Sequence, residues 1–153
     1  MKPTTAIIVL LLVASLSVVG CTNTTTHQLN QSTESAPATN SGIEVVVKAM
    51  QSPSRIGTET PRSGYRFVAY NTTVKNVDAP NRVITRNYFS LQDNMSRNYN
   101  MSGLSDSLGP FNWSSHSQPG DALGGIVVFE VPQNATLKSL TYFDGTTKIV
   151  TTL

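Results

Sequence analysis

The sequence is poor in the residues that build most active and metal sites. Its 153 residues include a single cysteine and two histidines, and only 13% of them are charged. One cysteine forms no internal disulfide, so a hydrophobic core alone has to hold the fold. So few histidines and cysteines exclude a His-rich metal site and a Cys–His pair, and no phosphate-binding loop, nucleophile elbow or zinc motif occurs. We therefore expect no enzymatic activity, no metal and no cofactor.

The sequence also lacks an excess of charge of either sign. Eleven Lys and Arg stand against nine Asp and Glu, which gives a formal net charge of +2. Such a balance favours neither nucleic acid nor an acidic membrane surface as a partner. The polar residues are instead largely Ser, Thr and Asn, which suits an extracellular setting.

Only one long apolar run occurs, and it lies at the N-terminus. Lys2 precedes the fourteen residues 6–19, AIIVLLLVASLSVV, whereas a membrane-spanning helix needs about 20 apolar residues. The run is typical of a signal peptide. The tetrapeptide VVGC that ends at Cys21 resembles the lipobox of prokaryotic lipoproteins, in which the cysteine is acylated and becomes the first residue. An incidental buried thiol, with an ordinary signal or an uncleaved anchor, is the alternative.

The lipobox resemblance implies a signal peptide over residues 1–20 and a lipid on Cys21 that holds the protein at the outer face of the cell membrane. Residues 21–41 have almost no large apolar side chains and a single charge, Glu34, so we expect a disordered linker. Residues 42–153 are long enough for one domain with its own core. The sequence thus predicts an anchor, a tether and a folded module.

Apolar residues alternate with polar ones throughout the module, as in strands that bury one face. The predicted strands are residues 43–49, 65–76, 82–85, 88–91, 97–101, 122–131, 137–143 and 146–152. The last two read as a hairpin with a two-residue turn at Asp144-Gly145, and residues 103–118 read as irregular. We therefore predict an all-β, immunoglobulin-like antiparallel β-sandwich of about seven to eight strands.

Two segments carry a resemblance to a known family. Residues 64–76, GYRFVAYNTTVKN, and residues 118–132, QPGDALGGIVVFEVP, resemble two strand motifs of a widespread family of domains of unknown function in prokaryotic secreted proteins and lipoproteins. The resemblance extends over roughly residues 43–150. It implies an immunoglobulin-type sandwich similar to that of a secreted immunoprotective extracellular antigen, and no active site. Some members carry a telomere-binding label, but this chain has no basic recognition helix to support such a role.

The sequence is rich in Asn-x-Ser/Thr sequons, the acceptors of N-glycans. Seven of the twelve asparagines lie in one, whereas the 36 Ser and Thr residues would give about three by chance. We predict glycosylation at Asn23, Asn30, Asn71, Asn94, Asn100 and Asn134, and leave out Asn112 because Trp113 fills its middle position. Sequons and a lipobox together indicate an archaeal cell surface. A Thr-rich composition without glycans is the alternative.

Two further segments are candidates for binding. Trp113 and His116, in FNWSSHSQ, form a candidate contact surface, because exposed aromatic side chains stack on sugars or peptides. Burial of Phe111 and Trp113 at one end of the sandwich is the alternative. The pair Asp93-Asn94 offers oxygens for calcium together with Asp78 or Asp106, although Asp-Asn is also a common turn.

These observations leave two functions open. The first is a surface module that contacts a partner protein or an envelope polymer, and the second is an extracytoplasmic receptor for a small ligand. A lined cavity would favour the receptor. A filled core with an exposed patch or an open edge strand would favour the contact module.

Overall fold

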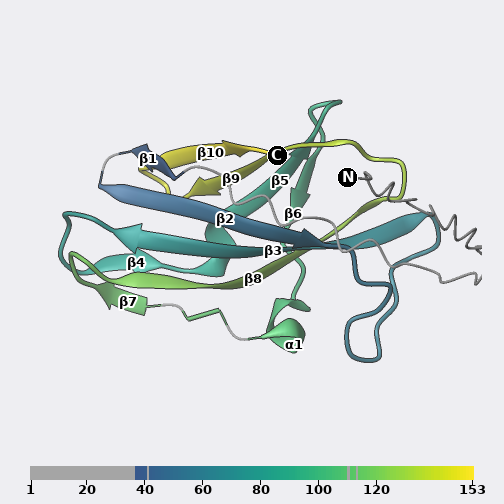
Figure 1. Cartoon of the computed structure of the whole chain (residues 1–153), viewed down its shortest axis with the longest axis horizontal. Coiled ribbons are helices and arrows are strands. Elements are labelled where there is room, and N and C mark those ends of the chain that lie inside the picture. Colours follow the sequence, from purple (N-terminus) through teal and green to yellow (C-terminus); the bar gives the residue numbers. More distant parts are fainter. Residues whose placement is uncertain (1–36, 41, 110, 113) are drawn as a thin grey trace, which may run out of the picture.

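The described part of the chain consists mainly of strands. The computed structural model describes residues 37–153 except 41, 110 and 113, and Figure 1 shows how its elements are arranged. The strands are β1 (Ala38–Asn40), β2 (Ile43–Gln51), β3 (Tyr65–Asn76), β4 (Arg82–Ile84), β5 (Phe89–Asp93), β6 (Asn98–Asn100), β7 (Ser114–Ser117), β8 (Ala122–Pro132), β9 (Leu137–Phe143) and β10 (Lys148–Thr152). A 3-10 helix, η1 (Arg86–Tyr88), and a short α-helix, α1 (Ser105–Leu108), complete the set.

Two four-stranded antiparallel sheets make up the sandwich. The first sheet has the order β1-β2-β3-β8, the second sheet has the order β10-β9-β5-β6, and β4 and β7 pair separately. The longest pairing joins β3 to β8, from Tyr65 opposite Pro132 to Lys75 opposite Ala122. This arrangement confirms the predicted antiparallel, immunoglobulin-like sandwich.

The main core lies between the inner faces of the two sheets. Because side chains alternate along a strand, Val68, Tyr70 and Val74 of β3 all point inward. Leu140 and Tyr142 of β9 belong to the same cluster. All five side chains are buried, so the space between the sheets is filled by apolar side chains and aromatic rings.

A second, smaller core covers the outer face of the first sheet. It consists of Ile56, Phe67, Ala69 and Val128, with Leu104, Leu108 and Ile126 packed against it. Phe67 on β3 and Val128 on β8 point away from the main core, and they are buried because other segments cover them. The loop between β2 and β3 supplies Ile56. The segment around α1, which lies beside β8 in Figure 1, supplies the two leucines.

The outer edge of β8 is also occupied. Ser102 N–H donates to the Val128 carbonyl at 2.7 Å, and Val128 N–H donates to Ser105 Oγ at 3.0 Å. Further along, Asn112 N–H donates to the Gly124 carbonyl at 2.9 Å. An edge strand of this length with free backbone groups would recruit other strands, and the chain between β6 and β7 satisfies those groups from within.

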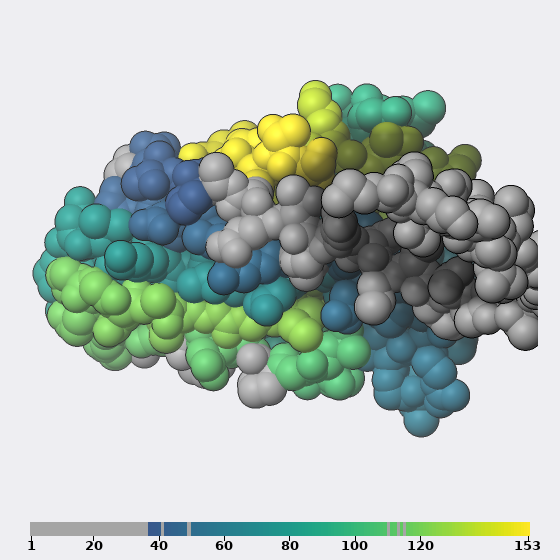
Figure 2. All heavy atoms as spheres, in the orientation of Figure 1, coloured from purple at the N-terminus to yellow at the C-terminus, as the bar shows by residue number. Residues whose placement is uncertain are grey.

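The edges of the two sheets approach each other at β1 and β10. Asn40 Nδ2 donates to the Lys148 carbonyl at 3.2 Å, and Figure 2 shows the blue surface of β1 beside the yellow surface of β10. Residues 38–40 form strand β1, so the prediction of a disordered linker is wrong for these residues. Their backbone pairs with β2, from Ala38 opposite Val45 to Asn40 opposite Ile43, and this pairing orders residues that have little apolar surface of their own.

Two other local predictions are wrong. Residues 103–118, expected to be irregular, contain α1 and β7, because Ser114 and Ser117 pair with β4 in a polar stretch that shows no apolar alternation. The β9–β10 turn is longer than the predicted two residues, since Phe143 pairs with Lys148. The Asp144 carboxylate accepts from Thr146 N–H at 2.9 Å and Thr147 N–H at 2.7 Å, which stabilises a four-residue loop.

Candidate functional site

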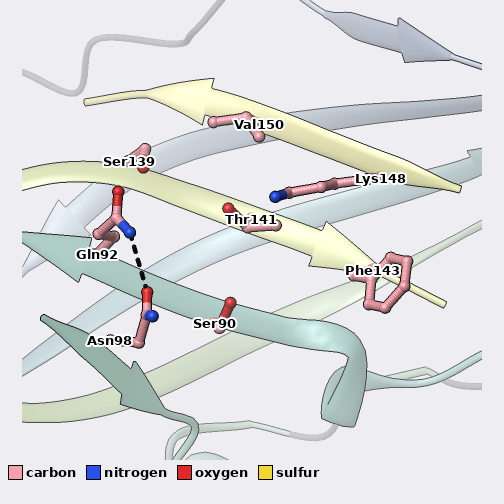
Figure 3. Close-up of a pocket in the computed structure, with 8 residues that line it drawn as sticks. All are labelled: Ser90, Gln92, Asn98, Ser139, Thr141, Phe143, Lys148 and Val150. Atoms are coloured by element: carbon pink, nitrogen blue, oxygen red, sulfur yellow. Dashed lines mark hydrogen bonds between the residues drawn. The ribbon is translucent and has the colours of Figure 1, made fainter. Parts of the chain in front are cut away.

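The outer face of the second sheet carries a polar groove. Strand register places its side chains in rows across the sheet: Ser139 beside Gln92 and Asn98, Val150 beside Thr141 and Ser90, and Phe143 beside Lys148. These eight residues line a surface groove of about 380 Å³. In Figure 3, Phe143 lies at one end of it and the amides of Gln92 and Asn98 lie at the other. We call this surface the polar groove.

The polar groove is lined chiefly by hydroxyl and amide groups. Gln92 Nε2 donates to Asn98 Oδ1 at 3.2 Å, which fixes the two amides relative to each other (Figure 3). Lys148 is the only charged residue in the lining. Two apolar side chains are exposed there, Phe143 by 51% and Val150 by 50%. The surface can therefore form many uncharged hydrogen bonds and one aromatic contact.

A second hollow, the Arg62 cleft, adjoins the polar groove at β6. It has a volume of about 310 Å³ and is lined by Arg62, Asn98, Tyr99, Asn100, Ser102 and Glu130. Arg62 Nε lies 2.9 Å from Glu130 Oε2, and Arg62 N–H donates to Glu130 Oε1 at 2.7 Å. The guanidinium of Arg62 also stacks on Tyr65, 4.3 Å from the ring centroid. Asn98 lines both hollows, so the two adjoin at β6, and we refer to them together as the path.

The turn between β5 and β6 is held by the buried carboxylate of Asp93. Its Oδ1 accepts from Met95 N–H and Arg97 N–H, each at 2.9 Å, and its Oδ2 accepts from Arg97 Nε at 2.6 Å and Tyr99 OH at 2.7 Å. Burial alone would raise the pKa of Asp93. The hydrogen bonds from Tyr99 and Arg97, with the charge of Arg97, lower this pKa to about 2.

This arrangement bears on the calcium hypothesis for Asp93-Asn94. Both Asp93 oxygens accept hydrogen bonds from protein donors, while Asp78 lies 4.0 Å from Arg82 and Asp106 pairs with Arg86. Across the described residues, no group of three His, Cys, Asp or Glu side chains is placed to hold a metal ion. Asp93 therefore serves the β5–β6 turn.

The structure separates the aromatic candidates. Phe111 is buried against Phe89, with ring centroids 6.2 Å apart, so it belongs to the core, as the alternative interpretation held. His116 is exposed on β7, and Trp113 lies outside the described residues. The contact surface of Trp113 and His116 stays a prediction.

The modification sites fall into two groups. Asn71, Asn94, Asn100 and Asn134 are all exposed, as a glycan acceptor requires. Cys21, Asn23 and Asn30 lie outside the described residues. No helix in the described part of the chain has the length and hydrophobicity needed to cross a membrane. The lipid and the glycans stay predictions.

Sequence analysis did not identify the polar groove. The small polar residues Ser139 and Thr141 alternate with Leu140 and Tyr142, which is a visible signal for a polar strand face. The alternation alone does not reveal that Ser90 and Gln92, almost fifty residues earlier, lie beside them. That neighbourhood depends on the β5–β9 register.

Three solved structures share the fold. YcdA of Bacillus subtilis, a proposed lipoprotein, has a TM-score of 0.59 at 15% identity over 76% of this chain. This chain spans only 38% of that protein. MPT63, a secreted protein of Mycobacterium tuberculosis, has a TM-score of 0.58 at 11% identity, over 77% of this chain and 92% of its own. A functionally unknown protein of Listeria monocytogenes has a TM-score of 0.53 at 12% identity, over 78% and 81%.

At these identities the likeness shows the fold alone. No curated protein sequence matches the chain. A family model described as a domain of unknown function matches residues 33–149, which contain both strand motifs from which the family was predicted. The chain therefore belongs to the DUF4352 family of domains of unknown function.

Proposed function

We propose that this protein is a non-catalytic, lipid-anchored module that contacts a partner protein or an envelope polymer at the outer face of the cell membrane through the polar groove. The observation that carries the proposal is the contrast between the two sheets. The outer face of the first sheet carries an apolar region around Phe67 and Val128 that other parts of the chain cover, whereas the hollowed polar groove on the second sheet is uncovered by any described element. A face of this kind is available to a partner.

The location is supported by both sequence and relatives. Cys21 follows an apolar run of signal-peptide length, and the similar structures include a proposed lipoprotein and a secreted protein. Two or more acyl chains hold a small domain stably on a membrane. Cys21→Ser in the native host should release the protein from washed membranes. Unchanged retention of the variant would contradict the anchor.

The alternative function, a small-ligand receptor, has less support. The polar groove and the Arg62 cleft are open hollows at the surface, while large apolar and aromatic side chains fill the space between the sheets. A small ligand is usually enclosed over most of its surface. Neither hollow offers that enclosure, so a larger partner fits the site better.

The proposal includes glycans on the exposed sequons and a place on an archaeal cell surface. The intact mass of the protein from its native host tests the glycans, since each one adds mass beyond polypeptide and lipid. Asn100 also lines the Arg62 cleft, so a glycan there would partly fill it. A mass equal to that of the lipidated polypeptide would rule out glycosylation.

A matched pair of variants tests the polar groove. Val150 in the groove and Val83 on β4 are both mid-strand valines, 50% and 44% exposed, and Val83 lies outside the groove lining. With the full-length chain, we expect Val150→Arg to lower retention on detergent-washed native envelopes at least fivefold, because the long cationic side chain fills the groove. Val83→Arg should behave as wild type. Equal retention of both variants and wild type would overturn the proposed use of this face.

A further inference from the structure

We infer that the polar groove, together with the adjoining Arg62 cleft where Asn100 carries no glycan, binds a neutral polysaccharide chain. The inference rests on the proposed function, because it names the partner of the same surface. Hydroxyl groups of Ser90 and Thr141 and amide groups of Gln92 and Asn98 line the groove, and each of these groups both donates and accepts hydrogen bonds. Sugar hydroxyls have the same double character. A sugar can therefore pair with this lining in several orientations.

The charge of the path favours a neutral polymer. No carboxylate lines the polar groove, and Lys148 is its only cationic residue. In the Arg62 cleft, the charge of Arg62 is balanced by Glu130 at 2.9 Å. Proteins that hold polyanions present several uncompensated cations. A polycation would in turn find no free carboxylate. Both classes of charged polymer therefore fit this path poorly.

Phe143 supplies the apolar contact that sugar binding requires. Its side chain is 51% exposed at one end of the groove (Figure 3), although aromatic side chains bury large areas when they can. The C–H groups on one face of a pyranose ring stack on such a ring. Half-exposed Val150 adds a second apolar side chain to the groove, opposite Thr141. A ring held at Phe143 places the rest of the chain over Thr141 and Ser90.

The length of the path favours a chain over a single sugar. The polar groove crosses all four strands of the second sheet, a width of roughly 14 Å at the usual strand spacing. The Arg62 cleft adjoins it at Asn98. A peptide strand would instead pair with a sheet edge, but edge strand β6 has only three residues, and edge strand β10 lies against β1 of the first sheet. An extended glycan uses the face itself.

Titration of the full-length, ¹⁵N-labelled protein in detergent micelles tests the inference. The probes are neutral hexasaccharides of glucose, mannose, galactose and N-acetylglucosamine, with hexagalacturonate as the anionic counterpart. We expect at least one neutral hexamer to shift the amide signals of β5, β6 and β9 at millimolar concentration. Phe143→Leu should weaken that binding about tenfold, since it keeps the bulk but removes the aromatic face. Phe143→Trp should retain it.

The outcomes separate the two proposals. If no neutral hexamer shifts these signals, or if hexagalacturonate binds more tightly and in a salt-dependent way, the neutral-polysaccharide inference is wrong. The proposed function still stands in that case, provided that Val150→Arg loses envelope retention and Val83→Arg does not. If Phe143→Leu binds the hexamer as wild type does, the aromatic contact is wrong. Loss of dispersed amide signals in the Leu variant would mean unfolding. Phe143→Trp then tests the aromatic contact, and failure of this folded variant to bind the hexamer would contradict it.

Discussion

The outer faces of the two sheets differ in whether their side chains are covered or exposed to water. On the first sheet, Phe67 and Val128 point outward and are buried, because the β2–β3 loop and the α1 segment cover them. On the second sheet, the outward positions include Ser90 and Thr141, and no described element covers the polar groove. Exposed apolar area has to be removed from water, whereas a polar face tolerates water and remains free for a partner.

The comparison also explains where the chain places its long connections. Residues 52–64 and the segment from Met101 to Leu108 both lie against the first sheet. The second sheet is joined mainly by short turns, such as Asp144–Thr147 between β9 and β10. These loops cover the first sheet, and they also contribute Arg62 and Ser102 to the Arg62 cleft.

The largest expected effect is a difference in unfolding free energy when one aromatic ring is removed from each outer face. Phe67→Ala should lower the free energy of unfolding by about 3–5 kcal/mol, because it leaves a cavity in the second core. Phe143→Ala should lower it by less than about 1 kcal/mol, because half of that side chain is already in water. Urea unfolding of the full-length variants measures both values. Equal losses would show that the second sheet is as closely covered as the first.

The tightness of the covered sheet can be tested at a glycine. A Cβ on Gly124 of β8 would collide with the Thr72 carbonyl oxygen of β3, whereas a Cβ on Gly103 would meet no atom within 4 Å. Gly124→Ala should therefore cost about 1–3 kcal/mol of unfolding free energy, and Gly103→Ala should cost far less. Urea midpoints compare the two. A tolerated Gly124→Ala would mean that β3 and β8 separate easily.

Local sequence pattern predicts the inner faces of both sheets but neither of their outer faces. Alternation in Tyr65–Asn76 and Leu137–Phe143 predicted both strands with the observed bounds, since each has an apolar inner face. The same alternation implied a solvated outer face for β3, but Phe67 and Ala69 there are buried. Their cover comes from Ile56 and Leu104, which have no periodic signal. Long-range packing and register, which created both the second core and the polar groove, are not encoded in local pattern.

Acid should loosen the uncovered sheet before the covered one. The pKa of Asp93 falls from 3.8 in the unfolded chain to about 2 in the fold. Its stabilising contribution is therefore complete above pH 3.8 and is lost as the pH falls towards 2. Between these values, hydrogen exchange of the β5 and β6 amides should accelerate more than that of β2 and β3. Asp93→Asn should abolish the difference, while Glu59→Gln at an exposed position should keep it.

The smallest expected effect is the most useful one for the functional proposal. Val150→Arg and Val83→Arg each place a long cation on a half-exposed strand position, and both should change the unfolding free energy by no more than about 0.5 kcal/mol. Arg is tolerated there because its stem can lie on the sheet while its charged end stays in water. Urea midpoints within that limit, combined with loss of envelope retention for Val150→Arg alone, would separate binding from folding. A large destabilisation confined to Val150→Arg would mean that other groups pack on Val150 in the native protein and that the polar groove is not open to a partner.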